Sequence, residues 1–142
     1  MVYVCEFEFW ESASGNVIAE PLTFDAEGTF GEDLTDAVES AADWLAMEVD
    51  DRLMSGGEMP PISFGHPVRH GGRVIAVAVS RDLSDIPAMT AADAARELGV
   101  SRARVAQLCK SGKLESWRDG SKRMVSRSSV ESRLEDMARC GC

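Results

Sequence analysis

Basic and amide side chains gather in one short stretch of the sequence, residues 101–110. If this stretch is a helix, Val105 and Leu108 lie on its inner face. The opposite face and its flanks then carry Ser101, Arg102, Ala103, Arg104, Ala106, Gln107 and Lys110. Glutamine pairs with adenine edges, arginine with guanine or phosphate, and small alanines allow close approach to a groove. The chemistry predicted for this stretch is therefore noncovalent recognition of double-stranded DNA.

The residues before this stretch predict the element that would position it. Thr90 with Asp93 can begin a helix in the manner of a capping box, and Gly99 allows the left-handed turn that ends it. Ser101 then caps a second helix. Two helices joined by a tight glycine turn form the arrangement that presents the second helix to a major groove.

A small basic hairpin is expected after the second helix. Its strands are residues 113–117 and 124–126, with Asp119-Gly120 as the turn signal. The tip carries Arg118, Lys122 and Arg123, the side chains that a wing touching the DNA backbone needs. A last helix follows, for which Ser128 and Glu131 are expected to form a capping box.

The run A-A-D-A-A-R-E-L-G-V-S-R-A-R-V-A-Q-L-C-K-S-G-K-L, with the basic hairpin and S-R-S-S-V-E-S-R-L after it, resembles the excisionase and MerR-type winged helix-turn-helix family. The L-G-V-S and G-K-L elements are fairly specific in this order. The resemblance implies a DNA-binding domain over the C-terminal third, with an operator as its partner.

The charge distribution divides the chain into two parts. Residues 1–87 hold four basic and seventeen acidic side chains, whereas residues 88–142 hold eleven basic and seven acidic ones. The first part should attract basic proteins, and the second can neutralise phosphates. Residues 83–88, with Pro87, are interpreted as a short linker, so the expected domains are 1–86 and 87–142.

The acidic part predicts an α+β domain. Residues 2–10 alternate as a half-buried strand, and a turn at residues 14–16 leads to a second strand, 17–24, that Pro21 interrupts or ends. Residues 25–31 leave room for a short third strand.

One helix is expected after these strands. Its apolar stripe consists of Leu34, Val38, Ala41, Leu45, Val49 and Leu53. Asp33 should cap this helix and Ser55-Gly56-Gly57 should end it. Residues 73–80 are expected to form a buried strand through Val74, Val77 and Val79. The order predicts an antiparallel-rich sheet with one helix on one face.

The strand-hairpin-strand start, the segment G-T-F-G-E-D-L-T-D-A-V-E-S-A-A-D-W-L and the segment G-E-M-P-P-I-S are similar to HicB antitoxins over residues 1–82. Asp36-Ala37 stands where Glu-Ala is usual, and E-P-L-T-F replaces the usual P-D-L-P-G, so the loop there should differ. The resemblance implies a partial ribonuclease H-like sheet. It also implies an antitoxin that binds a small basic ribonuclease toxin (HicA) and represses its own operon.

Two other functions remain open at this point. One is a free-standing transcriptional regulator whose N-terminal domain dimerises or senses a ligand. DNA readers of this class usually act as dimers, so a homodimer or higher homo-oligomer is expected, with the strand Tyr3–Phe9 or the face around Trp44 as the contact. The other is a metal-dependent nuclease using Glu6, Glu8, Asp25 and Asp33. The favoured interpretation is that these acids face solvent and that the protein is not an enzyme.

No metal or cofactor is expected. His66 and His70 are separated by Pro67 within a loop, so they should not form a helical metal pair, and Cys140 and Cys142 are interpreted as incidental. The longest apolar run, Val74–Val79, is too short to span a membrane. With no signal peptide expected and four cysteines lacking framework spacing, the prediction is a cytoplasmic protein with reduced thiols.

Overall fold

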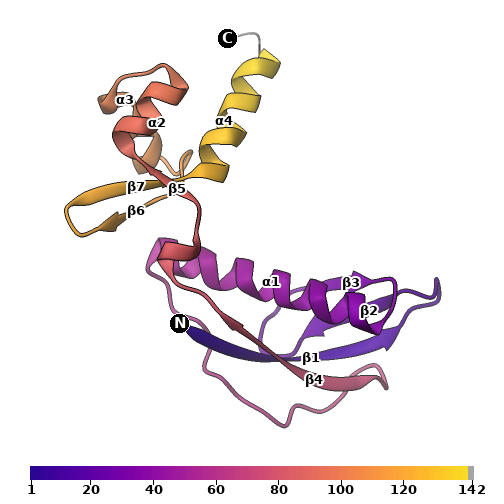
Figure 1. Ribbon diagram of the computed structural model, residues 1–142. Helices are drawn as coiled ribbons and strands as arrows, with labels where there is room; N and C mark the ends of the chain where they lie inside the picture. Colours follow the sequence, from indigo (N-terminus) through magenta and orange to yellow (C-terminus); the bar gives the residue numbers. More distant parts are fainter. Residues whose placement is uncertain (141–142) are drawn as a thin grey trace. The chain divides into compact units, whose positions relative to one another are not determined.

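The computed structural model describes residues 1–140, and the chain divides into two compact units (Figure 1). The first unit is Met1–Asp82 and the second begins at Leu83. The division between Asp82 and Leu83 therefore lies a few residues before the boundary that was predicted near residue 86. The difference arises because Leu83–Asp85 form a single 3₁₀ turn (η1) and Ile86 is buried, so this segment is not an unstructured linker.

The first unit contains a four-stranded antiparallel sheet with the order β3-β2-β1-β4. Its strands are β1 (Val2–Glu11), β2 (Val17–Pro21), β3 (Thr29–Gly31) and β4 (Arg73–Ser80). The predicted α+β fold is confirmed, and Pro21 ends β2. Strand β1 is central, because its residues pair with β2 on one side and with β4 on the other. The Tyr3–Phe9 strand therefore has no open edge for a second copy, and the expectation that it supplies a contact between copies is wrong.

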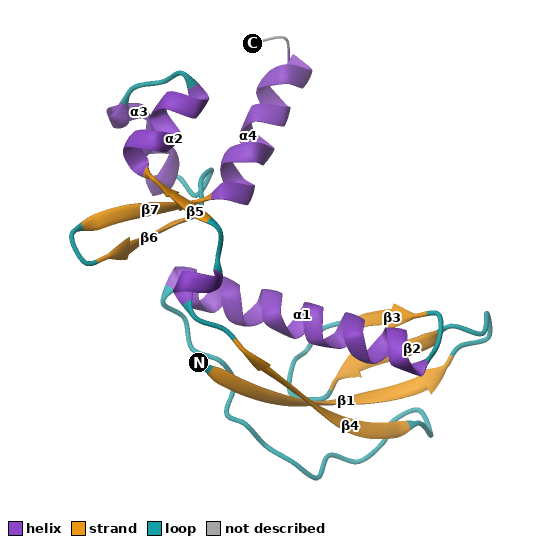
Figure 2. Ribbon diagram, in the orientation of Figure 1, coloured by secondary structure: helices purple, strands orange, loops and turns teal. Residues whose placement is uncertain are grey.

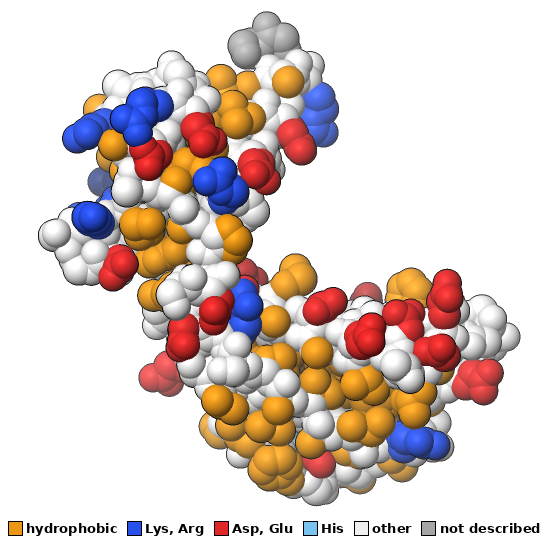
Figure 3. All heavy atoms as spheres, viewed as in Figure 1, with side chains coloured by type: hydrophobic (Ala, Val, Ile, Leu, Met, Phe, Trp, Pro, Cys, Tyr) orange, Lys and Arg blue, Asp and Glu red, His pale blue; other side chains and the backbone are white. Residues whose placement is uncertain are grey.

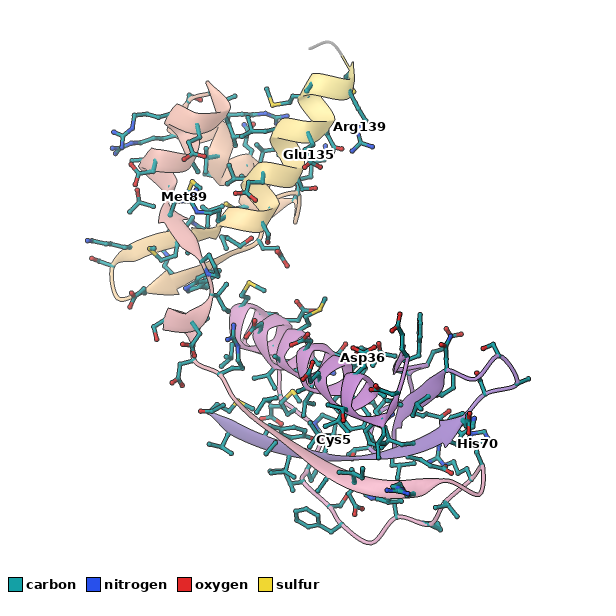
Figure 4. The ribbon with its side chains drawn as sticks, turned by 45° about the vertical axis from the view of Figure 1, so that its right-hand side comes forward. Cys5, Asp36, His70, Met89, Glu135 and Arg139 are labelled. Carbon is teal, nitrogen blue, oxygen red and sulfur yellow. The ribbon has the colours of Figure 1, made fainter. Side chains whose placement is uncertain are left out.

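Helix α1 (Leu34–Ser55) covers one face of this sheet (Figure 2). It begins where the Asp33 side chain accepts a hydrogen bond from the Asp36 backbone N–H at 2.8 Å, and it ends at Gly56, whose φ is +75°. The inward residues of α1 pack against the buried side chains of β1. The helix contributes Ala37, Ala41, Leu45 and Val49, and the strand contributes Tyr3, Cys5, Phe7 and Phe9. The label on Cys5 in Figure 4 marks this core between α1 and β1.

The opposite face of the sheet is covered in part by the loop of residues 57–72. The carboxylate of Glu8 accepts hydrogen bonds from the backbone N–H groups of Arg69 at 2.7 Å, His70 at 2.9 Å and Gly72 at 3.0 Å. Glu8 is fully buried. At Gly72 a side chain would have no room, since a Cβ there would lie 2.2 Å from the carbonyl oxygen of Phe9.

Glu6, two residues before Glu8 on the same face of β1, binds the same loop. Its Oε1 accepts from the His66 backbone N–H at 3.0 Å and lies 2.6 Å from Nδ1 of the His66 ring. The interpretation of Glu6 and Glu8 as solvent-face acids is therefore wrong for Glu8 and incomplete for Glu6. The reason is that the loop of residues 57–72, which is distant in sequence, covers this face of β1.

These contacts set the acidity of both carboxyls. Burial raises the pKa of Glu8, but the backbone hydrogen bonds from Arg69, Gly72 and His70 outweigh it and leave that pKa below its usual value. The backbone and ring hydrogen bonds from His66 lower the pKa of Glu6. Both groups are therefore held as carboxylates.

Strand β4 differs from the expected buried strand. It lies at the end of the sheet, and Val77 is its only buried residue. Ile75, Val77 and Val79 are paired with Phe7, Cys5 and Tyr3 and share their face, toward α1. Val74 is paired with Glu8 and so lies on the opposite face. The three valines named in the sequence analysis therefore do not form one buried side, because successive side chains of a strand point to opposite faces and Val74 is an odd number of residues from Val77 and Val79.

The second unit packs three helices with a small sheet. The helices are α2 (Ala91–Leu98), α3 (Arg102–Lys110) and α4 (Arg127–Cys140), and the antiparallel strands are β5 (Ala88–Thr90), β6 (Ser116–Asp119) and β7 (Lys122–Ser126) in the order β5-β7-β6. Strand β5 was not predicted, and only its first residue, Ala88, lies in the expected linker. It forms because Met89 pairs with Val125 and buries its side chain beneath α2 (Figure 4). Among the described residues, no helix is long and apolar enough to cross a membrane.

Candidate nucleic-acid interface

The turn between α2 and α3 is built by three local contacts. The Thr90 hydroxyl accepts from the Asp93 N–H at 3.2 Å and starts α2. Gly99 ends that helix with φ +67°, and Val100 then donates its N–H to the Ala95 carbonyl at 3.0 Å. The Ser101 hydroxyl accepts from the Arg104 N–H at 3.1 Å and starts α3. The predicted helix, tight turn and helix are present with the predicted caps.

The inner face of α3 is anchored in the core of the second unit. Val105 and Leu108 are buried, together with Leu98 from α2 and Val125 from β7. Cys109 packs against the edge of this core, as expected. Because two successive turns of α3 are fixed in this way, the rotation of the helix about its axis is fixed too. Its remaining side chains consequently point in defined directions.

The outer face of α3 is exposed along its whole length. The exposed residues are Ser101, Arg102, Ala103, Arg104, Ala106, Gln107 and Lys110. One guanidinium nitrogen of Arg104 donates to Oε1 of Gln107 at 3.3 Å, so two of these side chains are already linked without DNA. The helix thus presents a flat centre of two alanines bordered by hydrogen-bond donors.

The hairpin of β6 and β7 carries the second group of predicted residues. Its two-residue loop is Gly120-Ser121, because Asp119 pairs with Lys122; the predicted Asp-Gly turn is displaced by one residue. Gly120 has φ +62°, whereas the next loop residue, Ser121, does not have a positive φ, and this combination fits a type II′ turn.

Basic side chains face each other across this hairpin. Arg118 is paired directly with Arg123. Like charges in opposite positions of a sheet are destabilising. Arg118 also donates to the Ser121 carbonyl at 3.4 Å, and Arg123 donates to the Ser116 hydroxyl at 3.1 Å. Arg118 and Lys122 are exposed, whereas Arg123 is half-buried along the hairpin. An anion placed between these arginines would offset their repulsion.

The start of α4 differs from the predicted capping box. The Ser126 hydroxyl accepts from the Ser129 N–H at 3.2 Å and donates to the Glu115 carboxylate at 3.1 Å. Ser126 is therefore the cap, two residues before the predicted Ser128, which is exposed. The two serines flank Arg127 in the run S-R-S-S, and the pairing of β7 with β5 decides between them by burying Ser126.

Lys113 is exposed and was not among the predicted DNA contacts. Lys113 follows Gly112, whose φ is +78°, in the turn after α3, and its backbone N–H donates to the Leu108 carbonyl at 2.9 Å. The G-K-L motif that carries the family resemblance is the sequence signal that pointed to this position.

The comparison with protein families matches residues 88–138 to a family described as a helix-turn-helix domain. This match and the geometry of α2 and α3 together support a DNA-binding helix-turn-helix domain in the C-terminal part of the chain. The match runs from β5 into α4 and so contains α3 and the hairpin. It confirms the predicted resemblance for this part and supports a role in DNA-binding transcription regulation. Comparisons with curated proteins and with solved structures found no match. The similarity of the N-terminal part to HicB antitoxins therefore stays a prediction.

The acids considered for a nuclease site do not converge. Glu6 and Glu8 bind the loop, and Asp33 caps α1. Among residues 1–140, no group of three or more His, Cys, Asp or Glu side chains is arranged to hold a metal ion. His66 is paired with Glu6, and the His70 ring stacks on Trp10 with centroids 3.9 Å apart. Cys142 lies outside the described residues, and Cys140 is exposed.

The three tryptophans have packing contacts. Trp44 contacts Phe7 and Phe24 edge-on, with ring centroids 5.7 Å and 5.3 Å away. Trp117 is buried on β6, and Trp10 is half-buried beneath His70. These contacts agree with the prediction that the tryptophans are packing residues and not platforms for nucleic-acid bases.

Proposed function

We propose that the protein is an antitoxin and transcriptional repressor. In this proposal the helix-turn-helix domain reads the operator of its own gene, and the acidic N-terminal unit masks a small basic ribonuclease. The observation that carries the DNA-reading part is the exposed face of α3, whose orientation is fixed by Val105 and Leu108. The protein itself has no enzymatic activity in this proposal.

The α3 residues and the hairpin residues have different roles. Ala103 and Ala106 allow the helix backbone to approach the groove floor, while Arg102, Gln107 and Lys110 reach base edges. Arg104 orients Gln107. Arg118, Lys122 and Arg123 contact phosphates beside the groove, and Lys113 adds a further phosphate contact.

The proposed toxin-binding surface is the outward side of α1. Asp36, Glu39 and Asp43 are exposed at three- and four-residue spacing, so they form one acidic stripe along the helix. Figure 3 shows acidic side chains gathered over α1, where basic ones are nearly absent. Such a stripe steers a basic protein toward the unit and repels phosphates.

A paired gel-shift assay tests the DNA-reading part. The full chain is expected to bind the DNA upstream of its own gene at physiological salt in the presence of excess unrelated DNA. Arg102→Glu should abolish this binding, because it places a like charge against phosphates and base acceptors. Arg139→Glu makes the same charge change at an exposed position of α4 in the same unit, so it is the control and should bind as the wild type. Equal binding by Arg102→Glu would refute the assignment of α3.

Co-expression with the product of the adjacent gene tests the antitoxin part. The wild-type chain should restore growth, and so should a chain truncated after residue 86. Glu39→Lys with Asp43→Lys should not restore growth. Glu11→Lys with Asp25→Lys makes the same charge change at exposed positions away from the stripe and should still restore it. If no neighbouring product is toxic, or toxicity persists with the wild-type chain, the antitoxin part fails.

A ligand-sensing regulator is the second candidate. The observation in its favour is an open hollow of about 550 Å³ at the end of the sheet, lined in part by Trp10, Leu34, His70 and Arg73. In that case DNA binding would respond to a small molecule and would be unaffected by any neighbouring gene product. The co-expression experiment separates the two candidates.

A further inference from the structure

The free edge of β4 lacks the features by which proteins usually prevent strands from pairing. Within the described residues, β4 has a partner strand on one side only. Its sequence R-V-I-A-V-A-V-S has no proline and no lysine. Its register with β1 is continuous from Arg73 to Ser80, so no bulge turns the edge away. A long edge without a bulge, apolar from Val74 to Val79, is a template for another strand.

The charge of the surrounding segment removes the main obstacle to self-association. Residues 1–58 contain fifteen acidic side chains and one basic one. Residues 59–81 contain no Asp or Glu at all. Figure 3 shows the result: acidic side chains lie over α1, and the lower part of this unit, where β4 lies, is mainly hydrophobic. Two acidic units would repel each other through most of their surfaces, but not through β4.

The strand is also complementary to itself. In an antiparallel ladder, directly opposed residues lie on the same face of the sheet. A two-fold axis at Ala76 would oppose Val74 to Ala78 and Ile75 to Val77 of the second strand. Every pair inside this ladder is apolar, and Arg73 would face Val79 and not another arginine. Ala76 and Ala78 are exposed on one face of the strand, and because strand side chains project from the faces of a sheet, they do not obstruct the backbone edge of β4.

From these observations we infer that β4 pairs with β4 of a second copy of this chain. The two four-stranded sheets would then continue as one sheet across a two-fold axis, with each α1 on the same face of its own half. This interface uses neither α1's acidic stripe nor α3, so it stands independently of the proposed function.

Light scattering after size-exclusion chromatography tests this interface with the full chain. The wild type, at micromolar concentration, should have twice the 15.4 kDa mass of one chain. Ala78→Lys places an unpaired cation opposite Val74 and should raise the dimer dissociation constant by about tenfold or more. Ala13→Lys is the matched control, because Ala13 is exposed in the β1–β2 turn of the same unit, and it should remain a dimer. Both variants should keep the wild-type far-ultraviolet circular dichroism spectrum, since both positions are exposed, whereas only Ala78→Lys should lower the unfolding temperature, because it removes the stabilisation that the dimer provides.

A photo-crosslinking amino acid at Ala76 provides a second measurement that does not depend on disrupting the interface. It should yield a crosslinked dimer whose mass-spectrometric map joins residues 73–80 of both copies. The same probe at Ala13 should yield none. A monomeric wild type, an Ala78→Lys variant that stays dimeric, or a crosslink that maps to another segment or to another protein would each overturn the inference.

Discussion

The guanidinium of Arg104 donates a hydrogen bond to Oε1 of Gln107, 3.3 Å away, on the exposed face of α3. The bond occupies the carbonyl end of the glutamine side chain and leaves its amide N–H groups to donate. Since both residues are on the same helix one turn apart, the pair is arranged before any DNA arrives. A preorganised donor loses less side-chain entropy on binding than a freely rotating one.

We expect Gln107→Ala to change sequence preference. The loss should be about 1–3 kcal/mol on the preferred operator and much smaller on operators altered at the contacted base pair. Binding titrations across a panel of single-base operator variants measure this. A uniform loss over the whole panel would show that Gln107 does not read a base.

The hairpin should behave in the opposite way. We expect Arg123→Ala to weaken binding to all sequences alike and to reduce the slope of log K against log salt by about one. The reason is that phosphate contacts carry no sequence information. Titrations of specific and unrelated DNA at several salt concentrations check this, and a loss confined to the specific operator would contradict it.

Glu8→Gln should destabilise the N-terminal unit by about 1.5–3 kcal/mol. Three backbone N–H groups would lose their charged acceptor, and the amide NH₂ of glutamine would face these N–H donors without an acceptor of its own. Urea unfolding measures the change in free energy. Glu11→Gln, at the exposed end of the same strand, is the control and should stay within about 0.5 kcal/mol of the wild type.

The lowered pKa values of Glu6 and Glu8 predict an acid dependence of stability. A carboxyl whose folded pKa lies below its unfolded one stabilises the fold above the unfolded value, here 4.5. That contribution is lost as the pH falls through 4.5 toward the folded pKa. The stability difference between wild type and Glu8→Gln should therefore be constant near neutral pH and shrink below this point. A difference that grew on acidification would contradict the prediction.

Ser126→Ala should destabilise the helix-turn-helix domain by about 1 kcal/mol, because it removes the cap of α4. Ser128→Ala, two residues away and exposed, should have little effect. Thermal unfolding of the two variants decides between the cap seen in the structure and the capping box expected from the sequence.

The elements that local chemistry determines could be predicted from the sequence. Asp33, Thr90 and Ser101 cap the helices that they were expected to cap, and Gly56 and Gly99 end theirs. Each of these contacts joins residues only a few positions apart, so the sequence pattern contains all the partners.

Features that depend on distant segments could not be predicted in this way. Glu8 alternates with apolar residues as a solvent-facing acid would, and only the return of residues 69–72 buries it. Val74 belongs to an apolar run, and its face is decided by the pairing with β1. For the same reason Ser126 and not Ser128 caps α4: the choice follows from the pairing of β7 with β5.

The pairing of β1 with β4 also sets an order of assembly during synthesis. Strand β1 leaves the ribosome well before β4, so residues 2–9 must wait for residues 73–80, and Figure 1 shows the two strands, indigo and pink, lying side by side. Long-range pairings of this kind slow folding, whereas the contacts of the second unit connect nearer neighbours. Until β4 has been synthesised, one edge of β1 has no partner strand. A nascent chain with such an exposed edge can associate with other chains and aggregate. Conditions that stall translation just before residue 73 should therefore be the ones in which this protein aggregates.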